Sequence, residues 1–426
     1  MLSEFDYFSP SILQSSVLNE YDELVQAKTV SRSGPIQFEV GGAANLYRDL
    51  SNSYLQVKCK VVQASGAALA ENAPVAPVNL LLHSLFSNVS VVMNTKELTE
   101  KDSNYAYRAY LETLLTYSDE VLKTRGCVTG WFKDDAATMN AIILADAGTA
   151  KANTGFVARN AMSSLSKEIT LIGRPHCDNF HQNLDIPPNC PLRITFTQTK
   201  DSFALMAAAN ATFKIELISA TMYIRTKVGN PEMIAAHTEM LNTTPMRLPQ
   251  TQVNLRTHTL AAGTRSSTID LSIPSKLPKR IVVGFLAQAA TAGTYDNNPF
   301  NFQNFGLTDL RLSLNGQSIP ADGLTMDYSV GDYHRAYLNT LAALEINTGN
   351  RGIALTPKEF KQGFNLYAFK LAPGTLDNNV QPNATNGTLK LSCSFKEGLP
   401  ESTDVVVYSE SFSVLEIDKL GSVLTF

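Results

Sequence analysis

The sequence lacks several features that would assign it to a familiar class of protein. Only five of its 426 residues are cysteines, scattered and without a CxxC pair, so we expect buried thiols in a reducing compartment rather than a disulfide framework. These are Cys59, Cys127, Cys177, Cys190 and Cys393. No run of about 18 apolar residues occurs, and the first residues are acidic where a secretory signal is basic. The chain is therefore expected to be soluble, non-secreted and not inserted in a membrane.

Clustered positive charge and the common catalytic motifs are also missing. The formal net charge is −4, and basic residues gather only in small groups such as Lys279-Arg280. Strong nucleic-acid binding needs a basic stripe or patch, so we do not expect it. The sequence contains no HExxH, no G-x-S-x-G, no P-loop and no G-x-G-x-x-G. We predict that the protein is not an enzyme and has no cofactor or catalytic residue.

The length and composition describe a folded protein of more than one domain. Apolar residues make up 44% of the chain and charged residues 17%, which is typical of globular domains and unlike disordered chains. A chain of 426 residues exceeds the size at which one hydrophobic core stops growing. Two domains are therefore the first expectation.

A repeated segment indicates that the two domains are copies of each other. Residues 108–114 (RAYLETL) and 335–341 (RAYLNTL) agree at six of seven positions. Before each copy lies a hairpin pattern, at 91–98 and 312–319. After each copy come two strand patterns whose starts are 23 residues apart, at Ile169 and Leu192 and again at Leu366 and Leu389. A period of about 200 residues is far longer than a solenoid repeat and indicates a duplicated domain.

The order hairpin, helix, strands in each copy predicts an all-β protein with two tandem jelly-roll sandwiches and short helices in the loops. We expect an N-terminal arm at residues 1–30, a first jelly roll at 31–228, a linker with a short helix at 229–249 and a second jelly roll at 250–426. The first copy is longer between its helix and its next strand, which predicts an insertion of about one loop around Trp131, the one tryptophan.

The strongest candidate for a metal site is PHCDNFHQNLDIPPNC, residues 175–190. His176, Cys177, His181 and Cys190 offer ligand types that zinc prefers. However, His176 and Cys177 are adjacent, and the cysteine spacing fits no common zinc finger. We therefore favour a loop that connects strands and holds no metal, with a zinc site as the alternative.

The repeated helix supplies the other candidate residues. Arg108 and Arg335 occupy matching positions, which favours an ion pair or subunit contact placed alike in both copies over a solvated arginine. Tyr110 and Tyr337 lie on the apolar stripe of each helix, so we expect them in the core rather than against a cofactor.

Four segments resemble the major capsid proteins of Polinton and adintovirus-type elements: APVNLLLHSLFSNVSVVMNTKEL with YAYRAYLETLL (76–115), IGRPHCDNFHQNLDIPPNCPLRITF (172–196), LPKRIVVGFL (277–286) and NNPFNF (297–302). The resemblance covers most of the chain after about residue 35. It implies a double jelly-roll protein of the adenovirus-type lineage, three copies of which form a pseudo-hexagonal capsomer of an icosahedral DNA virus or virus-like transposon.

The same resemblance implies a virion location, assembly in the host cytoplasm or nucleus, and minor and penton capsid proteins as further partners. An alternative from a different class is a soluble β-sandwich module that binds carbohydrate or protein, such as a lectin. A capsid protein must bury large lateral surfaces against other copies, whereas a lectin works as a monomer or small oligomer.

Overall fold

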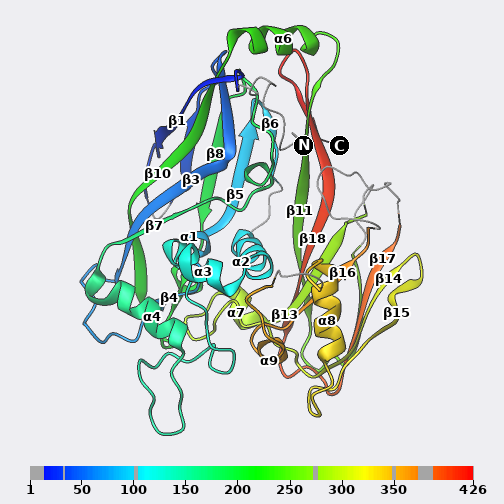
Figure 1. The fold of residues 1–426 in the computed structure, drawn as a ribbon. Coiled ribbons are helices and arrows are strands. Elements are labelled where there is room, and N and C mark those ends of the chain that lie inside the picture. Colours follow the sequence, from blue (N-terminus) through cyan, green and yellow to red (C-terminus); the bar gives the residue numbers. More distant parts are fainter. Residues whose placement is uncertain are drawn as a thin grey trace, which may run out of the picture.

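Alternating apolar and polar residues build the long strands of this protein. In strand β3 (Leu46–Gln63) the side chains of Leu55, Val57 and Cys59 are buried, while the residues between them face outward. The structure is a computed structural model that describes residues 14–31, 34–99, 104–271, 277–347, 352–372 and 387–425. Within these residues the strands form two sandwiches that stand side by side (Figure 1).

The first sandwich, called the first barrel below, consists of two four-stranded sheets with the orders β1-β10-β3-β7 and β2-β8-β5-β6. All of its strand pairs are antiparallel. Besides β3, its strands are β1 (Val17–Gln26), β2 (Ile36–Val40), β5 (Phe86–Met93), β6 (Lys96–Glu97), β7 (Ile169–Gly173), β8 (Leu192–Gln198) and β10 (Phe213–Gly229). A small separate pair is formed by β4 (Ala76–Pro77) and β9 (Leu205–Met206).

The second barrel repeats this arrangement with the sheets β11-β18-β13-β16 and β12-β17-β14-β15, and β19 adds to β18. Its strands are β11 (Met246–Leu260), β12 (Ser266–Asp270), β13 (Arg280–Ala287), β14 (Leu307–Leu314), β15 (Gln317–Thr325), β16 (Leu366–Lys370), β17 (Leu389–Phe395), β18 (Thr403–Ile417) and β19 (Val423–Thr425). When the eight main strands of each barrel are numbered along the chain, both barrels have the sheet orders 1-8-3-6 and 2-7-4-5. This shared topology is the jelly roll, so the predicted all-β double jelly roll is confirmed.

The repeated elements fall where the sequence places them. Helices α2 (Tyr105–Thr116) and α8 (His334–Ala343) follow the hairpins β5-β6 and β14-β15. Both hairpins turn at an asparagine with positive φ, Asn94 at 55° and Asn315 at 52°, a conformation that asparagine tolerates better than most residues. The strands β7, β8, β16 and β17 begin at the four residues predicted from the repeat.

The loops carry the remaining helices. They are α1 (Leu81–Ser84), α3 (Asp119–Thr124), η1 (Gly126–Thr129), α4 (Thr154–Ser163), η2 (Ser164–Ser166), η3 (Asp178–Phe180), α5 (Asp201–Ala204), α6 (Pro231–Leu241), α7 (Gln288–Ala292) and α9 (Pro357–Lys361). The insertion of the first copy is therefore more than the single loop expected, because it contains α3, η1, α4 and η2.

The N-terminal region differs from the expected arm. Residues 17–26 form strand β1 at the edge of the first barrel, paired along its length with β10. Most of its side chains are exposed, so no apolar alternation marks it in the sequence. Residues 1–13 of the expected arm lie outside the described residues. The limits 31–228, 229–249 and 250–426 remain a proposal, with residues 17–26 moved into the sheet of the first barrel.

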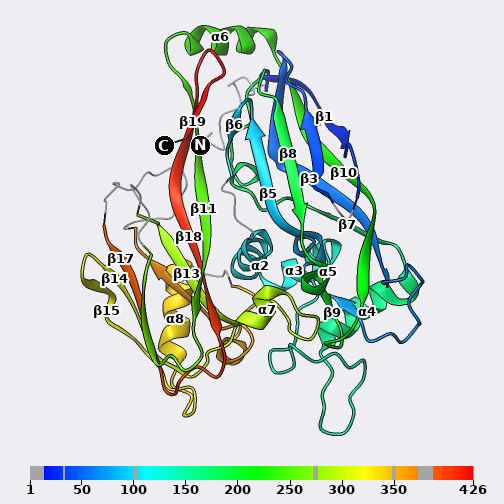
Figure 2. The ribbon, with the colours of Figure 1, turned by 180° about the vertical axis from the view of Figure 1, so that it is seen from behind.

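The expected linker helix is present as α6, which spans the same end of both barrels (Figure 2). It begins as the sequence suggests, with Pro231 in its first turn and the Asn230 side chain accepting a hydrogen bond from the Glu232 backbone nitrogen. However, none of its residues is buried. The contacts that hold the two barrels together must therefore lie elsewhere.

Two expectations from composition can be compared with the structure. No disulfide joins the five cysteines, all of which lie in the described part of the chain, and four of them are buried. Cys127 is exposed, contrary to expectation, because it lies on the surface turn η1. Among the described helices, none has both the length and the apolar character needed to cross a membrane.

Candidate functional site

Helix α2 fills the junction between the two barrels. Nine of its 12 residues are buried. Its Tyr110, as expected, lies in the core, where it packs on Phe300 and Phe302 of the second barrel. Because this aromatic cluster draws on both halves of the chain, burying it requires the barrels to stay together.

A buried ion pair lies beside this apolar contact. Arg108 Nε is 2.8 Å from Glu112 Oε1 on the same helix, and Arg108 Nη2 is 2.7 Å from Asp178 Oδ1. The side chain of Arg108 is 12% exposed and that of Asp178 is 3% exposed. Asp178 also accepts a hydrogen bond from the backbone nitrogen of Val253 in β11. Arg108 thus forms the predicted ion pair, and its partner Asp178 reaches the second barrel directly.

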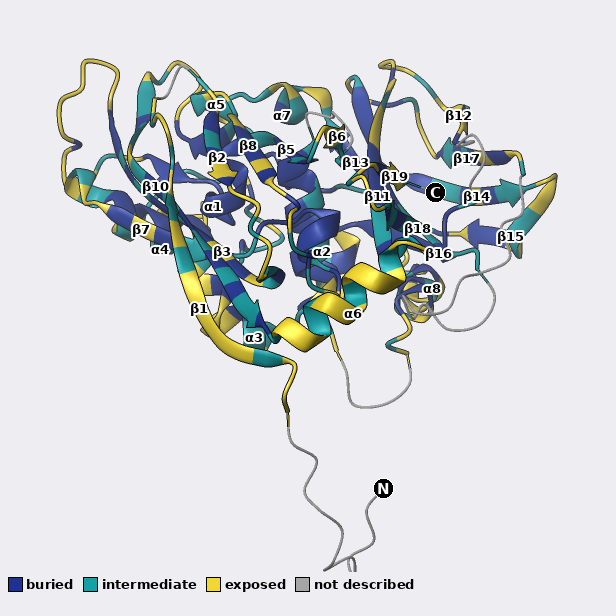
Figure 3. Ribbon diagram, turned by 90° about the horizontal axis from the view of Figure 1, so that it is seen from above, coloured by how far each residue is buried: buried dark blue, intermediate teal, exposed yellow. Residues whose placement is uncertain are grey.

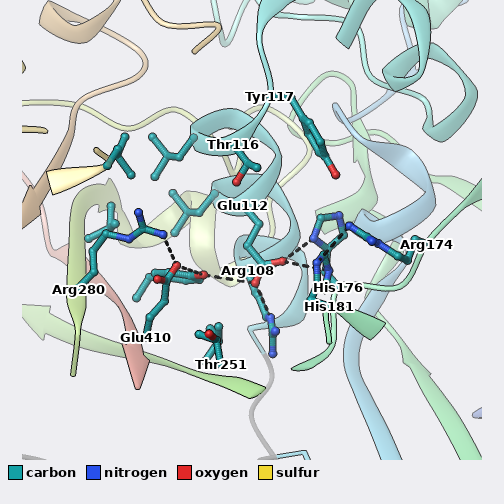
Figure 4. Close-up of a pocket in the computed structure, with 16 residues that line it drawn as sticks. Arg108, Glu112, Thr116, Tyr117, Arg174, His176, His181, Thr251, Arg280 and Glu410 are labelled. Carbon is teal, nitrogen blue, oxygen red and sulfur yellow. Dashed lines mark hydrogen bonds and ion pairs between the residues drawn. The ribbon is translucent and has the colours of Figure 1, made fainter. Parts of the chain in front are cut away.

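The second barrel meets this cluster with a network of its own, drawn in Figure 4. Arg280 Nη2 lies 2.6 Å from Glu410 Oε1. The hydroxyl of Tyr408 donates to Glu410 Oε1 at 2.9 Å and lies 3.3 Å from Glu112 Oε1. These groups surround a cavity of about 270 Å³ at the junction. Each carboxylate of the network is paired with a cation, a histidine or a hydroxyl, which suits holding two surfaces in register.

Three histidines complete the part of the junction that the first barrel contributes. His176 Nδ1 is 2.6 Å from Glu112 Oε2, and His181 Nε2 is 3.7 Å from the same oxygen. The ring of His83 meets that of His176 edge-on at 4.6 Å, and its Nδ1 bonds to the hydroxyl of Tyr105. Burial lowers the pKa of His83 well below 6.5, and the neighbouring His176 acts in the same direction.

The pKa values of Glu112 and His181 follow from the burial of these side chains and from their charged neighbours. Burial raises the pKa of the Glu112 carboxyl, but Arg108 and His176 outweigh it and hold the pKa well below 4.5. Burial lowers the pKa of His181 to about 3, although Glu112 acts against the shift. At neutral pH the cluster therefore combines an ionised Glu112 with a neutral His181.

Glu112, His176 and His181 are also the one group of potential metal ligands found among the described residues, with ligand atoms within 4.8 Å of one another. The second nitrogen of His181 argues against a metal here. Arg174 Nη2 lies 3.2 Å from His181 Nδ1, and an arginine can only donate, so His181 Nδ1 accepts and Nε2 carries the proton. A metal-binding Nε2 needs the opposite tautomer, with the other nitrogen donating. The donor set fits a hydrogen-bonded network better than a metal ion.

The structure brings together only part of the candidate metal set read from the sequence. His176 and His181 lie close, with ring centroids 5.4 Å apart, but neither Cys177 nor Cys190 joins the described ligand group. The pKa of the Cys190 thiol is raised by burial to about 11, which suits an inert thiol.

Glu112 was missed as a site residue, although the sequence contains a signal for it. It is the single position at which the repeated segments differ, since Asn339 replaces it in the second copy. The difference matters because Glu112 is the common partner of Arg108, His176 and Tyr408. Comparing the copies at their one mismatch would have singled it out.

The insertion of the first copy provides a second attachment to the second barrel. Arg159 on α4 forms an ion pair with Asp134 at 2.6 Å, and both side chains are at most 1% exposed. Its other donors bond to the carbonyl oxygens of Pro77 and Phe132. Asn298 of the second barrel then donates to Asp134 Oδ2 at 3.1 Å. The insertion thus clamps the second barrel through a fully satisfied polar network.

The same helix in the second copy has different surroundings. Only three of the ten residues of α8 are buried. Arg335 forms an ion pair with Asp322 of β15, in which both side chains are more than half exposed. Tyr337 is partly buried and its hydroxyl donates to the carbonyl oxygen of Leu355. The ion pairs of Arg108 and Arg335 are therefore not equivalent, because Arg108 lies beneath the second barrel, whereas Arg335 lies on a face of α8 that is exposed in the described chain.

Comparisons with known proteins identify solved structures that share this fold. No family model matches the sequence. An uncharacterized protein of Caenorhabditis elegans is 24% identical over 425 residues, covering 95% of this chain and 96% of that protein. Among solved structures, a chain of the Sputnik virophage superimposes with a TM-score of 0.64 at 13% identity, covering 100% of this chain and 91% of that chain.

Two further viral structures show the same likeness. For the major capsid protein of mavirus the TM-score is 0.56 at 12% identity, with coverage of 100% and 95%. For the Faustovirus major capsid protein it is 0.60 at 10% identity, with coverage of 96% and 92%. At such identities the shared feature is the fold, which in these neighbours is the double jelly roll of viral capsid proteins.

Proposed function

We propose that this chain is a structural capsid protein and that its building block is a homotrimer with six barrels in a ring. The neighbours that share its fold over nearly the whole chain include proteins named as major capsid proteins. The described part of the chain contains an elaborate polar network at the barrel junction, in which Asp178 and Tyr408 each take part in a hydrogen bond that crosses from one barrel to the other. A structural role accounts for this arrangement without any reaction.

The observation that carries the proposal is the way in which the two barrels meet. The first barrel contributes helix α2, and the second contributes the outer face of the sheet that contains β11, β18 and β13. The contact therefore joins two different surfaces, although the barrels have one topology. A head-to-tail contact of this kind leaves one surface of each type uncovered, one on each barrel. Further copies can therefore bind to the open surfaces until a ring closes. With two barrels per chain, three chains complete a sixfold outline, and such outlines tile the flat faces of a shell.

The finer assignments rest on the sequence resemblance. We propose a capsid of the Polinton and adintovirus type, a virion location, assembly in the host cytoplasm or nucleus, and minor and penton capsid proteins as additional partners. A near-full-length relative in an animal, Caenorhabditis elegans, fits a capsid gene carried in an animal genome. The shortage of basic clusters fits a shell protein without strong nucleic-acid binding.

The mass of the purified chain in solution tests the trimer. Size exclusion with light scattering should give a mass three times that of the 46.4 kDa chain. Negative-stain microscopy of the expressed protein should then show ring-shaped units or closed particles. A strict monomer at micromolar concentration that never yields particles would contradict the capsid role and favour the β-sandwich binding module.

A further inference from the structure

We infer that the exposed face of helix α8 and the outer face of the sheet β1-β10-β3 are the two halves of one contact between copies of this chain. The inference rests on the proposed capsid function and adds the surfaces through which the copies meet. Its basis is that the chain contains the same contact once already, between its own two barrels.

The exposed face of α8 consists of His334, Arg335, Leu338 and Ala342. Leu338 is 58% exposed, whereas Leu111, the matching residue of α2, is 1% exposed. The same helix position is therefore buried in the first copy and open to solvent in the second. Among the described residues, the apolar stripe of α8 therefore lacks the cover that α2 receives from the second barrel.

The surface that packs over α2 shows which kind of surface would pack over α8. Leu111 lines the junction cavity together with Val253, Val282 and Tyr408, which point outward from the sheet β11-β18-β13. Across this sheet Val253, Glu410 and Arg280 are cross-strand neighbours in one row. The first barrel has the matching sheet β1-β10-β3, in the same order. In a ring, the outer face of that sheet on the next copy takes the place over α8 that β11-β18-β13 takes over α2.

The outer face of β1-β10-β3 has the composition of an unoccupied contact. Leu24, Tyr223 and Tyr54 are cross-strand neighbours in one row across the three strands. They face away from the barrel core because Met222 and Leu55, which follow or precede them in their strands, are buried in it. Leu24 is 56% and Tyr54 41% exposed. Tyrosine is enriched at the centre of protein interfaces, and a row of exposed apolar side chains suits such a contact.

Charged side chains border both faces. On the sheet side, Glu20 and Asp22 of β1 are 59% and 45% exposed and pair with Arg225 of β10. On the helix side, Arg335 pairs with Asp322 of β15. Each face therefore has charged residues around its apolar ones, as the polar rim of a protein interface usually does.

The positions of the two faces suit a ring. Seen from above, β1 lies along the outer edge of the first barrel, and α8 lies on one flank of the second barrel, away from β1 (Figure 3). Neither face can cover the other within one chain. Each copy therefore presents one face to the preceding copy and the other to the following copy, as a closing head-to-tail assembly requires.

Substitutions on each face test the inference in the full-length protein. We expect Leu338→Asp and Leu24→Asp each to shift the mass by light scattering from three chains to one, because either change places a carboxylate in the apolar centre of the contact. Both side chains are exposed in the single chain, so the melting temperature of the monomeric variants should equal that of a wild-type monomer obtained by dilution. The matched control is Leu420→Asp, which changes a leucine that is 84% exposed on the turn after β18 and on neither face. It should remain a trimer.

Disulfide trapping supplies a second readout. In a Cys127→Ser background, which removes the exposed thiol, Leu338→Cys is combined with Leu24→Cys or with Tyr54→Cys and the protein is oxidised. Covalent dimers and trimers are expected from these pairs, but not from the single variants or from Leu338→Cys with Leu420→Cys. A trimer that survives both aspartate substitutions without cross-linking would overturn the inference and leave the capsid proposal standing. A wild-type chain that is only monomeric would overturn both.

Discussion

Tyr110 lies flat against Phe300, with ring centroids 4.1 Å apart and 2° between the ring planes. The first ring belongs to helix α2 of the first barrel, and the second precedes β14 in the second barrel. A helical linker is stiffer than a Gly/Ser tract, but α6 has no buried residue. The stacked rings and the surrounding ion pairs join the barrels.

Removing the stacked ring should destabilise the whole chain. We expect Tyr110→Ala to lower the free energy of unfolding by about 3–5 kcal/mol, because the fully buried side chain leaves a cavity between the barrels. Urea unfolding followed by the fluorescence of Trp131, whose ring is 5.4 Å from that of Tyr110, measures the loss. The control is Tyr337→Ala at the matching position, where the ring is only partly buried and the loss should be clearly smaller. Equal losses would contradict the special role of the junction.

The two matching arginines should respond differently to the same change. Arg108→Met leaves Asp178 and Glu112 buried without their cation, which should lower the free energy of unfolding by about 3 kcal/mol. Arg335→Met removes an exposed ion pair and should leave the unfolding of the single chain unchanged within error. Urea titrations of both variants as monomers provide the comparison. A measurable loss of unfolding free energy in Arg335→Met alone would contradict the assignment of the stabilising buried ion pair to Arg108.

Stability should fall as the pH falls below neutral. In the unfolded chain a histidine binds a proton below about 6.5, whereas the pKa of the enclosed His181 is lowered to about 3. Between these values the unfolded state binds more protons, so the free energy of unfolding decreases with falling pH, by up to about 2 kcal/mol from pH 7.5 to pH 5 for this group. The pKa of His83 is lowered in the same direction by burial and adds to the effect.

The contribution of His181 can be separated by substitution. Urea unfolding of wild type and His181→Asn at pH 7.5 and pH 5 should show a smaller difference between the two pH values in the variant. The asparagine can still accept a hydrogen bond from Arg174, so the contact of the native side chain is partly kept. An unchanged difference would show that His181 does not titrate between these pH values on unfolding.

The protein should not hold zinc in stoichiometric amount. The reason is the orientation of His181, whose Nδ1 accepts from Arg174. Elemental analysis after dialysis is expected to give well below one equivalent per chain. Zinc near one equivalent that is lost in Cys190→Ser would establish the ligand set considered from the sequence. Zinc that is lost in His181→Asn but kept in Cys190→Ser would establish Glu112, His176 and His181 instead.

Local pattern was enough to predict the fold. The hairpin turns at Asn94 and Asn315 and the strand starts at Ile169 and Leu366 depend on residues close in the sequence, and the duplication supplied each signal twice. Strand β1 escaped prediction because its edge position leaves most side chains in water, so no burial period marks it. Helix α4 escaped because the insertion has no counterpart in the second copy with which to compare it.

The site depended on contacts between distant segments. Nothing in the local sequence places Glu112 beside His176, which follows 64 residues later, or beside Tyr408, which follows 296 residues later. The sequence grouped His176 with Cys177 and Cys190 because they are neighbours along the chain. In the structure α2 packs against the loop before η3 and against the face of β18. Glu112 therefore meets His176 and Tyr408 instead.

The repeated helix separates what the local sequence determines from what tertiary packing determines. By itself the sequence determined that both copies form an amphipathic helix after a hairpin, since backbone periodicity and turn chemistry act over a few residues. Only the tertiary structure decided that Leu111 is covered and Leu338 is exposed. The reason is that burial is a property of the neighbouring surface: the second barrel lies against α2, whereas no described segment lies over Leu338 on α8.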